Sequence, residues 1–126
     1  MAVVLIVEDE EQVRVLAESY LQEQGHHTVS AATAEEALAA LDVTEDADLL
    51  FTDIGLHGDL RAGLELAKRA VQRRPELKVL YTTGQGVTDG MIAMFVKGSA
   101  VLPKPYTVDQ LQRSLDIHFD IASAAP

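Results

Sequence analysis

The chain has 126 residues, 48% of them hydrophobic, with no cysteine and a formal net charge of −10 at pH 7. This length suits one domain with its own core, and the missing cysteines exclude disulfides, thiol catalysis and cysteine-ligated zinc. The acidic balance opposes direct binding to nucleic acid or to an anionic membrane. The first apolar run ends at acids too soon for a signal peptide, and no run is long enough to span a bilayer, so we expect a cytoplasmic protein.

Five short apolar runs alternate with amphipathic stretches of helical length. Such runs are typical of buried strands in a parallel sheet, and the alternation predicts an α/β fold with helices on both faces of five parallel strands. The predicted elements are, in chain order, a strand at 2–7, a helix at 10–24, a strand at 28–32, a helix opened by Thr33, a strand at 48–52, a helix ended by Pro75, a strand at 78–82, a helix within about 86–97, a strand at 100–102 and a helix from Thr107 to Phe119.

Local signals support several of these boundaries. The spacings Thr33 to Glu36 and Thr107 to Gln110 match capping boxes, and Gly25 is a plausible end for the first helix. We predict one domain at 1–121, a short tail at 122–126, and no output domain.

Polar residues follow four of the five predicted strands. The first strand runs into Glu8 and Asp9, the third into Asp53, the fourth into Thr83 and the fifth into Lys104. Function in open α/β sheets collects at the carboxyl ends of the strands, so these side chains are expected at one rim. Carboxylates suit a divalent cation, and lysine and threonine suit a phosphoryl group.

These residues, in this order and at these separations, closely resemble the motifs of the receiver domain of two-component response regulators. The resemblance covers essentially the whole chain. The segments TDIGLHGDLRAGLELA and LKVLYTTGQG are most similar to receivers associated with hybrid sensor kinases. The resemblance implies a (βα)5 flavodoxin-like receiver fold. It also implies a phosphoryl group accepted from a histidine kinase or a histidine phosphotransfer protein, and signalling through protein contacts.

The carboxylates have distinct expected roles. Asp53 is the expected phosphoacceptor, because a carboxylate can attack phosphorus and form an acyl phosphate. Two carboxylates about 5 Å apart repel by roughly 3 kcal/mol at an effective dielectric near 20, so a cluster of three favours a bound cation. Mg²⁺ fits because it takes few protein carboxylates and keeps waters. The resemblance implies that Asp9 is a direct ligand, that Glu8 acts through water, and that the Gly55 carbonyl completes the set.

Two further residues complete the expected site. Lys104 would pair with phosphoryl oxygens, and the resemblance implies a cis Lys104–Pro105 peptide that aims its side chain inward. Thr83 would donate its hydroxyl to the phosphoryl group. The four histidines have no metal-ligand spacing, and the methionines at 91 and 94 are expected to fill the core.

The sequence departs from the family pattern at two positions. Val101 stands where many receivers carry an aromatic residue that moves with the threonine, and a β-branched side chain has little rotamer freedom. His57 stands where proline is frequent, which suggests a more mobile loop. The resemblance places the signalling face at 86–97, 100–102 and 107–119.

Several functions remain open on the sequence. The chain is expected to be a stand-alone receiver that is not an enzyme beyond its own phosphorylation and dephosphorylation. Alternatives are a phosphate sink, a module of a hybrid kinase, or a degenerate receiver used only for binding. A metal-dependent phosphatase of the haloacid-dehalogenase type needs an acid two residues after its nucleophile, where this chain has Gly55.

Overall fold

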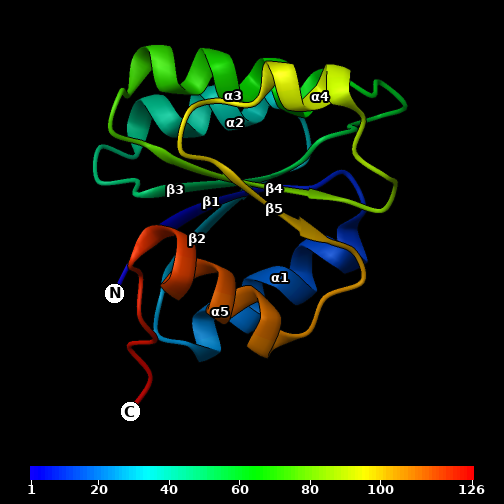
Figure 1. Cartoon of the computed structure of the whole chain (residues 1–126). Helices are drawn as coiled ribbons and strands as arrows, with labels where there is room; N and C mark the ends of the chain where they lie inside the picture. The colour runs from blue at the N-terminus through cyan, green and yellow to red at the C-terminus, as the bar shows by residue number, and fades with distance from the viewer.

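Five parallel strands form the central sheet, in the order β2-β1-β3-β4-β5 (Figure 1). The computed structural model describes residues 1–126. Each predicted strand is confirmed within one residue at either end. The bounds are Val3–Val7 for β1, His27–Ala31 for β2, Leu49–Asp53 for β3, Lys78–Thr83 for β4 and Ala100–Pro103 for β5.

Helices cover both faces of this sheet, as predicted. On one face lie α1 (Glu11–Glu23) and α5 (Val108–Phe119), and on the other lie α2 (Ala34–Val43), α3 (Ala62–Arg73) and α4 (Asp89–Met94) (Figure 1). This arrangement confirms the expected α/β class. None of the helices is both long enough and apolar enough to cross a bilayer.

Two apolar cores fill the spaces between the sheet and its helices. In β1, Leu5 and Val7 join the core under α2 and α3, while Val4 and Ile6 join the core with α1 and α5. Every residue of β1 and of β3 is buried. This burial on both faces explains why the strands are continuous apolar runs rather than alternating ones.

The two predicted capping boxes differ. At the start of α5, the Thr107 hydroxyl oxygen accepts from the Gln110 N–H and the Gln110 side chain accepts from the Thr107 N–H, so this box is confirmed. At the start of α2, Thr33 accepts from the Glu36 N–H at 3.1 Å, but the Glu36 carboxylate accepts from the N–H of Ala32 instead of Thr33. The second box is therefore only half formed, because the carboxylate binds one residue further back.

The fourth helix is shorter than expected. It covers Asp89–Met94, not about 86–97, and begins after Thr88, whose hydroxyl oxygen accepts from the Met91 N–H at 3.1 Å. Phe95 leaves the helix with an extended backbone, and its ring stacks on Tyr81 with centroids 4.7 Å apart. The Val96 N–H then donates to the Tyr81 hydroxyl at 3.1 Å. These tertiary contacts end the helix earlier than the apolar pattern indicates.

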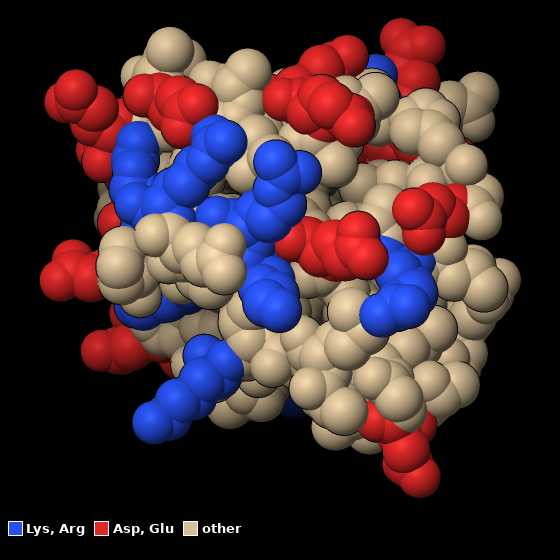
Figure 2. Space-filling view, turned by 90° about the horizontal axis from the view of Figure 1, so that it is seen from above, with Lys and Arg blue, Asp and Glu red and all other residues tan.

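Basic side chains gather over the layer of α2, α3 and α4, on an otherwise acidic protein (Figure 2). Arg73 in α3 donates to both carboxylate oxygens of Asp42 in α2 at 2.8 Å. Arg74 donates to the carbonyls of Leu41 and Thr44, near the end of α2. These two arginines therefore tie the end of α3 to the carbonyl end of α2.

Candidate functional site

The parallel sheet brings the predicted polar residues to one rim. The strand register sets Asp53 beside Thr82, and Thr83 beside Pro103, which precedes Lys104. Asp9, Asp53, Thr83 and Lys104 line a common cavity of about 400 Å³ together with Gly55. Glu8 lies just beneath it, 3% exposed. All the residues predicted from the sequence are thus close together.

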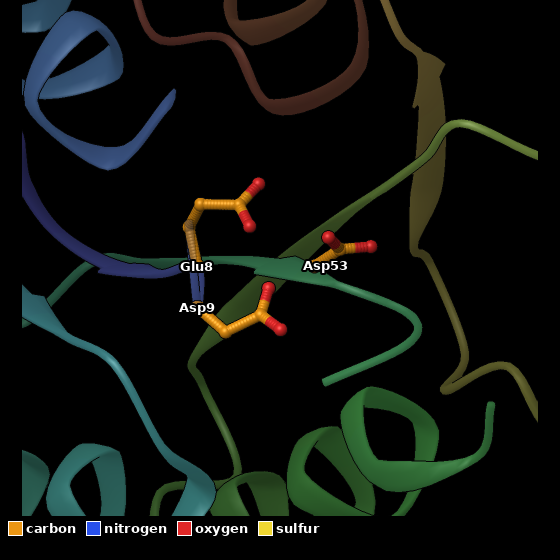
Figure 3. Close-up of side chains that lie close together, drawn as sticks. All are labelled: Glu8, Asp9 and Asp53. Carbon is orange, nitrogen blue, oxygen red and sulfur yellow. The ribbon is translucent and has the colours of Figure 1, made fainter. Parts of the chain in front are cut away.

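Three carboxylates form the centre of this rim. One oxygen from each of Glu8, Asp9 and Asp53 lies within 4.8 Å of the others. Figure 3 shows the three side chains leaving the ends of β1 and β3 side by side. At this separation unscreened carboxylates repel by a few kcal/mol, so the cluster needs positive charge near it.

Lys104 supplies positive charge from the neighbouring strand end. Its ammonium group donates to Asp53 Oδ2 at 2.7 Å and to Glu8 Oε1 at 2.5 Å. The Lys104–Pro105 peptide is cis, as the resemblance implied. Burial alone would lower the pKa of Lys104, but the hydrogen bonds to Asp53 and Glu8 raise it to about 12. The ammonium is therefore charged at neutral pH.

Burial is the main influence on the pKa of the Glu8 carboxyl. Desolvation raises the pKa of the Glu8 carboxyl above its usual value, and the hydrogen bond from Lys104 opposes that rise without cancelling it. Its second oxygen, Oε2, accepts from the Glu10 N–H at 3.2 Å. Glu8 is thus held on both oxygens, whereas Asp53 makes its one ion pair through Oδ2.

Asp9 is held by a residue whose part the sequence did not reveal. The His57 backbone N–H donates to Asp9 Oδ2 at 2.9 Å. Desolvation would raise the pKa of Asp9, but the hydrogen bond from the His57 N–H helps to lower it below its usual value. His57 was expected only to mark a mobile loop. In the structure it lies in a turn that is closed by two backbone hydrogen bonds of 3.0 Å between Leu56 and Asp59.

Thr83 reaches the cavity from the end of β4, whereas Glu8 and Asp9 follow β1. Its hydroxyl oxygen accepts from the Gln85 N–H at 3.1 Å, and the Lys104 N–H donates to its backbone carbonyl at 2.9 Å. The hydroxyl proton is left to donate to a group placed in the cavity. Thr83 and Lys104 thus approach the same space from neighbouring strands.

Gly63 is a second residue of the site whose importance the sequence did not reveal. Its N–H donates to the Ile54 carbonyl at 2.8 Å, and a Cβ added at this position would lie 1.8 Å from the Asp53 carbonyl oxygen. Only glycine lets α3 pack this closely beneath Asp53. The sequence predicted Gly63 at the end of the loop before this helix, whereas the structure places it in the first turn of α3, where glycine is unfavourable.

The donor set fits a hard divalent cation. Asp9 and Asp53 each keep one carboxylate oxygen outside the contacts to His57 and Lys104. Gly55 lines the same cavity, and its carbonyl accepts none of the backbone hydrogen bonds of the loop. Oxygen ligands from few protein groups, with space for water, are what Mg²⁺ requires.

Comparison with known proteins agrees with the geometry. Residues 4–116 match the response regulator receiver domain. The chain belongs to this family. This receiver domain is 31% identical to the nitrogen assimilation regulatory protein NtrX of Azorhizobium caulinodans, and the 109 aligned residues cover 86% of this chain and 24% of NtrX. It is also 31% identical to the DNA-binding transcriptional regulator NtrC of Salmonella typhimurium, with an alignment that covers 86% of this chain and 23% of NtrC.

A solved structure supports the same fold. The CheY-like receiver domain protein of Methanospirillum hungatei superimposes with a TM-score of 0.82 at 26% identity, over 95% of this chain and 94% of the other. The flavodoxin-like receiver fold is thereby confirmed. The chain spans about a quarter of the curated relatives. Receiver domains are regulatory modules of two-component signalling that bind Mg²⁺ at acidic residues and interact with histidine kinases and downstream targets.

Proposed function

We propose that this receiver domain accepts a phosphoryl group on Asp53 from a phosphohistidine, in a reaction that depends on Mg²⁺. The observation that carries the proposal is the position of the Asp53 carboxylate. It lines the cavity at the rim, accepts a hydrogen bond from the Lys104 ammonium, and has an oxygen within 4.8 Å of oxygens of Glu8 and Asp9.

The proposed reaction is an in-line transfer between two proteins. An Asp53 oxygen attacks phosphorus while the phosphorus–nitrogen bond of the donor breaks, and the histidine nitrogen keeps the electron pair. The product on this chain is an acyl phosphate. Lys104 is then free to pair with a phosphoryl oxygen, and the Thr83 hydroxyl donates to another.

The metal ligands are proposed to be the residues expected from the sequence. Asp9, Asp53 and the Gly55 carbonyl would hold Mg²⁺ directly, and Glu8 would act through water. When bound, the cation supplies charge neutralisation for the phosphoryl oxygens. Glu8 suits the indirect role because its two oxygens already accept from Lys104 and from the Glu10 N–H.

A phosphodonor protein must contact the surface next to Asp53, and such a surface is available. A groove of about 550 Å³ lies between α1 and the segment after β5, and it is lined by Leu16, Tyr20 and Tyr106 beside Lys104. Leu16 and its neighbour Val15 are about half exposed, at 50% and 51%. We assign this groove to the apolar face of the helix that carries the donor histidine in a histidine kinase or a histidine phosphotransfer protein.

The proposed role of the chain is regulatory. The residue two positions after Asp53 is Gly55, which offers no carboxylate to protonate a leaving group or to activate water, as the haloacid-dehalogenase phosphatases require. Output is proposed to pass through protein contacts of the face formed by α4, β5 and α5. Val101 is half-buried beside Tyr81 in this part of the sheet, with no ring to relocate.

Phosphotransfer from a labelled histidine kinase or histidine phosphotransfer protein tests this function. The wild-type chain is expected to gain label as the donor loses it, and a chelator of Mg²⁺ is expected to stop the transfer. Asp53→Asn should gain none, whereas Asp59→Asn, which alters an exposed acid of the neighbouring turn, should be labelled like the wild type. Equal labelling of Asp53→Asn would contradict the assignment.

A further inference from the structure

The turn between β3 and α3 holds a histidine, His57, in a backbone conformation that few residues other than glycine adopt. Leu56 and Asp59 close it by their reciprocal hydrogen bonds, and the two residues between them have positive φ, 51° at His57 and 79° at Gly58. Two consecutive positive φ values define a type I′ turn. Glycine is common at such positions and histidine is one of the few other residues found there.

His57 uses this conformation to connect three segments of the rim. Its backbone N–H donates to Asp9 Oδ2 at 2.9 Å, just after β1. Its ring nitrogen Nε2 lies 2.9 Å from the carbonyl oxygen of Ala32, just after β2, and donates to it. The ring therefore fixes the turn against the chain after β2, and the fixed turn aims an N–H at the carboxylate of Asp9.

We propose that His57 is a positioning residue for a divalent cation: it holds the Asp9 carboxylate in the orientation that the cation needs. This inference rests on the proposed function, because it concerns the same metal site. One Asp9 oxygen is bound by the His57 N–H, which fixes the carboxylate plane and leaves the second oxygen for the cation. Removal of a hydrogen bond that orients a metal-ligating side chain typically lowers metal affinity about tenfold or more.

The ring itself is not a ligand in this proposal. It is directed to the Ala32 carbonyl, and its contribution to the site passes through the backbone N–H. A proline at position 57 has no N–H to donate, so this means of orienting Asp9 depends on the departure from the family pattern at His57.

Titration of the 126-residue chain with Mg²⁺ in a calorimeter tests the proposal. His57→Gly removes the ring while keeping an N–H and tolerating the positive φ. We expect its Kd for Mg²⁺ to rise by roughly three- to tenfold, because the turn loses its attachment to Ala32 and the N–H is no longer held in place. His57→Gln, which restores a side-chain N–H donor of similar reach, is expected to recover part of the affinity.

Gly58→Ala is the matched control. It strains the same turn at φ 79° without touching either hydrogen bond of His57, so it should lower the melting temperature and leave the Kd unchanged. An unchanged Kd in His57→Gly, with wild-type binding intact, would overturn the positioning role alone, as would an equal rise in Gly58→Ala. A wild-type chain that binds no Mg²⁺ would overturn both this role and the proposed metal-dependent function.

Discussion

Lys104 allows the electrostatics of the rim to be tested by one substitution. Lys104→Met keeps an unbranched side chain of similar length and removes the ammonium that bonds to Glu8 and Asp53. The side chain of Lys104 is only 18% exposed, and those of its partners are 4% and 13% exposed. Solvent screening is therefore limited, and the substitution leaves two poorly solvated carboxylates without their counter-charge.

The magnitude follows from the pKa of Lys104. Each unit of pKa corresponds to about 1.4 kcal/mol. The rise from 10.5 to about 12 therefore represents about 2 kcal/mol of stability at neutral pH. At about 2.1 cal/mol/K per residue, a loss of about 2 kcal/mol lowers the melting temperature of a chain of this length by roughly 7 °C.

The pH dependence has a definite sign. Because the folded-state pKa of Lys104 is raised, its contribution is fully present below the unfolded pKa near 10.5 and is lost as pH rises through about 12. The difference between wild type and Lys104→Met is therefore expected to stay constant from neutral pH to about 10 and to shrink above that.

Thermal melts followed by circular dichroism provide the assay. With a chelator present, Lys104→Met should melt well below the wild type, while Lys97→Met, which alters an exposed lysine without an ion pair, should not. Adding Mg²⁺ should raise the melting temperature of Lys104→Met more than that of the wild type, because the ammonium no longer competes for the same carboxylates. A Lys104→Met protein as stable as Lys97→Met in chelator would show that the Lys104 ammonium does not stabilise the rim.

Three further predictions follow from other contacts. Gly63→Ala should destabilise the fold by about 3 kcal/mol or more in urea unfolding, because its Cβ would meet the Asp53 carbonyl at 1.8 Å. Gly86→Ala, whose Cβ would have no atom within 4 Å, should be nearly neutral, and equal stabilities of the two variants would contradict the packing. Leu16→Ser should slow phosphotransfer from a histidine kinase without changing phosphorylation by a small phosphodonor, and equal slowing of both reactions would remove the groove from donor docking. Adding a phosphoryl mimic should shift backbone NMR signals across residues 84–97, and changes confined to the neighbours of Asp53 would contradict transmission through this segment.

Much of the fold is predictable from the sequence because burial on both faces leaves a strong local pattern. The strands that carry the site are continuous apolar runs, so their ends, and hence the rim with Asp9, Asp53 and Lys104, follow from the positions of the runs. The register then brings these side chains together without further information.

The differences arise where a tertiary contact overrides a local signal. The apolar pattern continues through Phe95 and Val96, but the stacking of Phe95 on Tyr81 ends α4 at Met94. Likewise, the hydrogen bond from His57 to Asp9 joins residues 48 positions apart, and the close approach of Gly63 to Asp53 depends on how α3 packs. No local pattern specifies such contacts.

The intact mass of the protein after incubation with Mg²⁺ and a small phosphodonor tests directly whether Asp53 accepts a phosphoryl group in a Mg²⁺-dependent reaction. The wild-type chain should gain the mass of one phosphoryl group, and chelation of Mg²⁺ should prevent that gain. Asp53→Asn should show no gain under the same conditions. Phosphorylation of Asp53→Asn to the wild-type extent would contradict Asp53 as the acceptor, and phosphorylation of the wild type without Mg²⁺ would contradict the metal dependence.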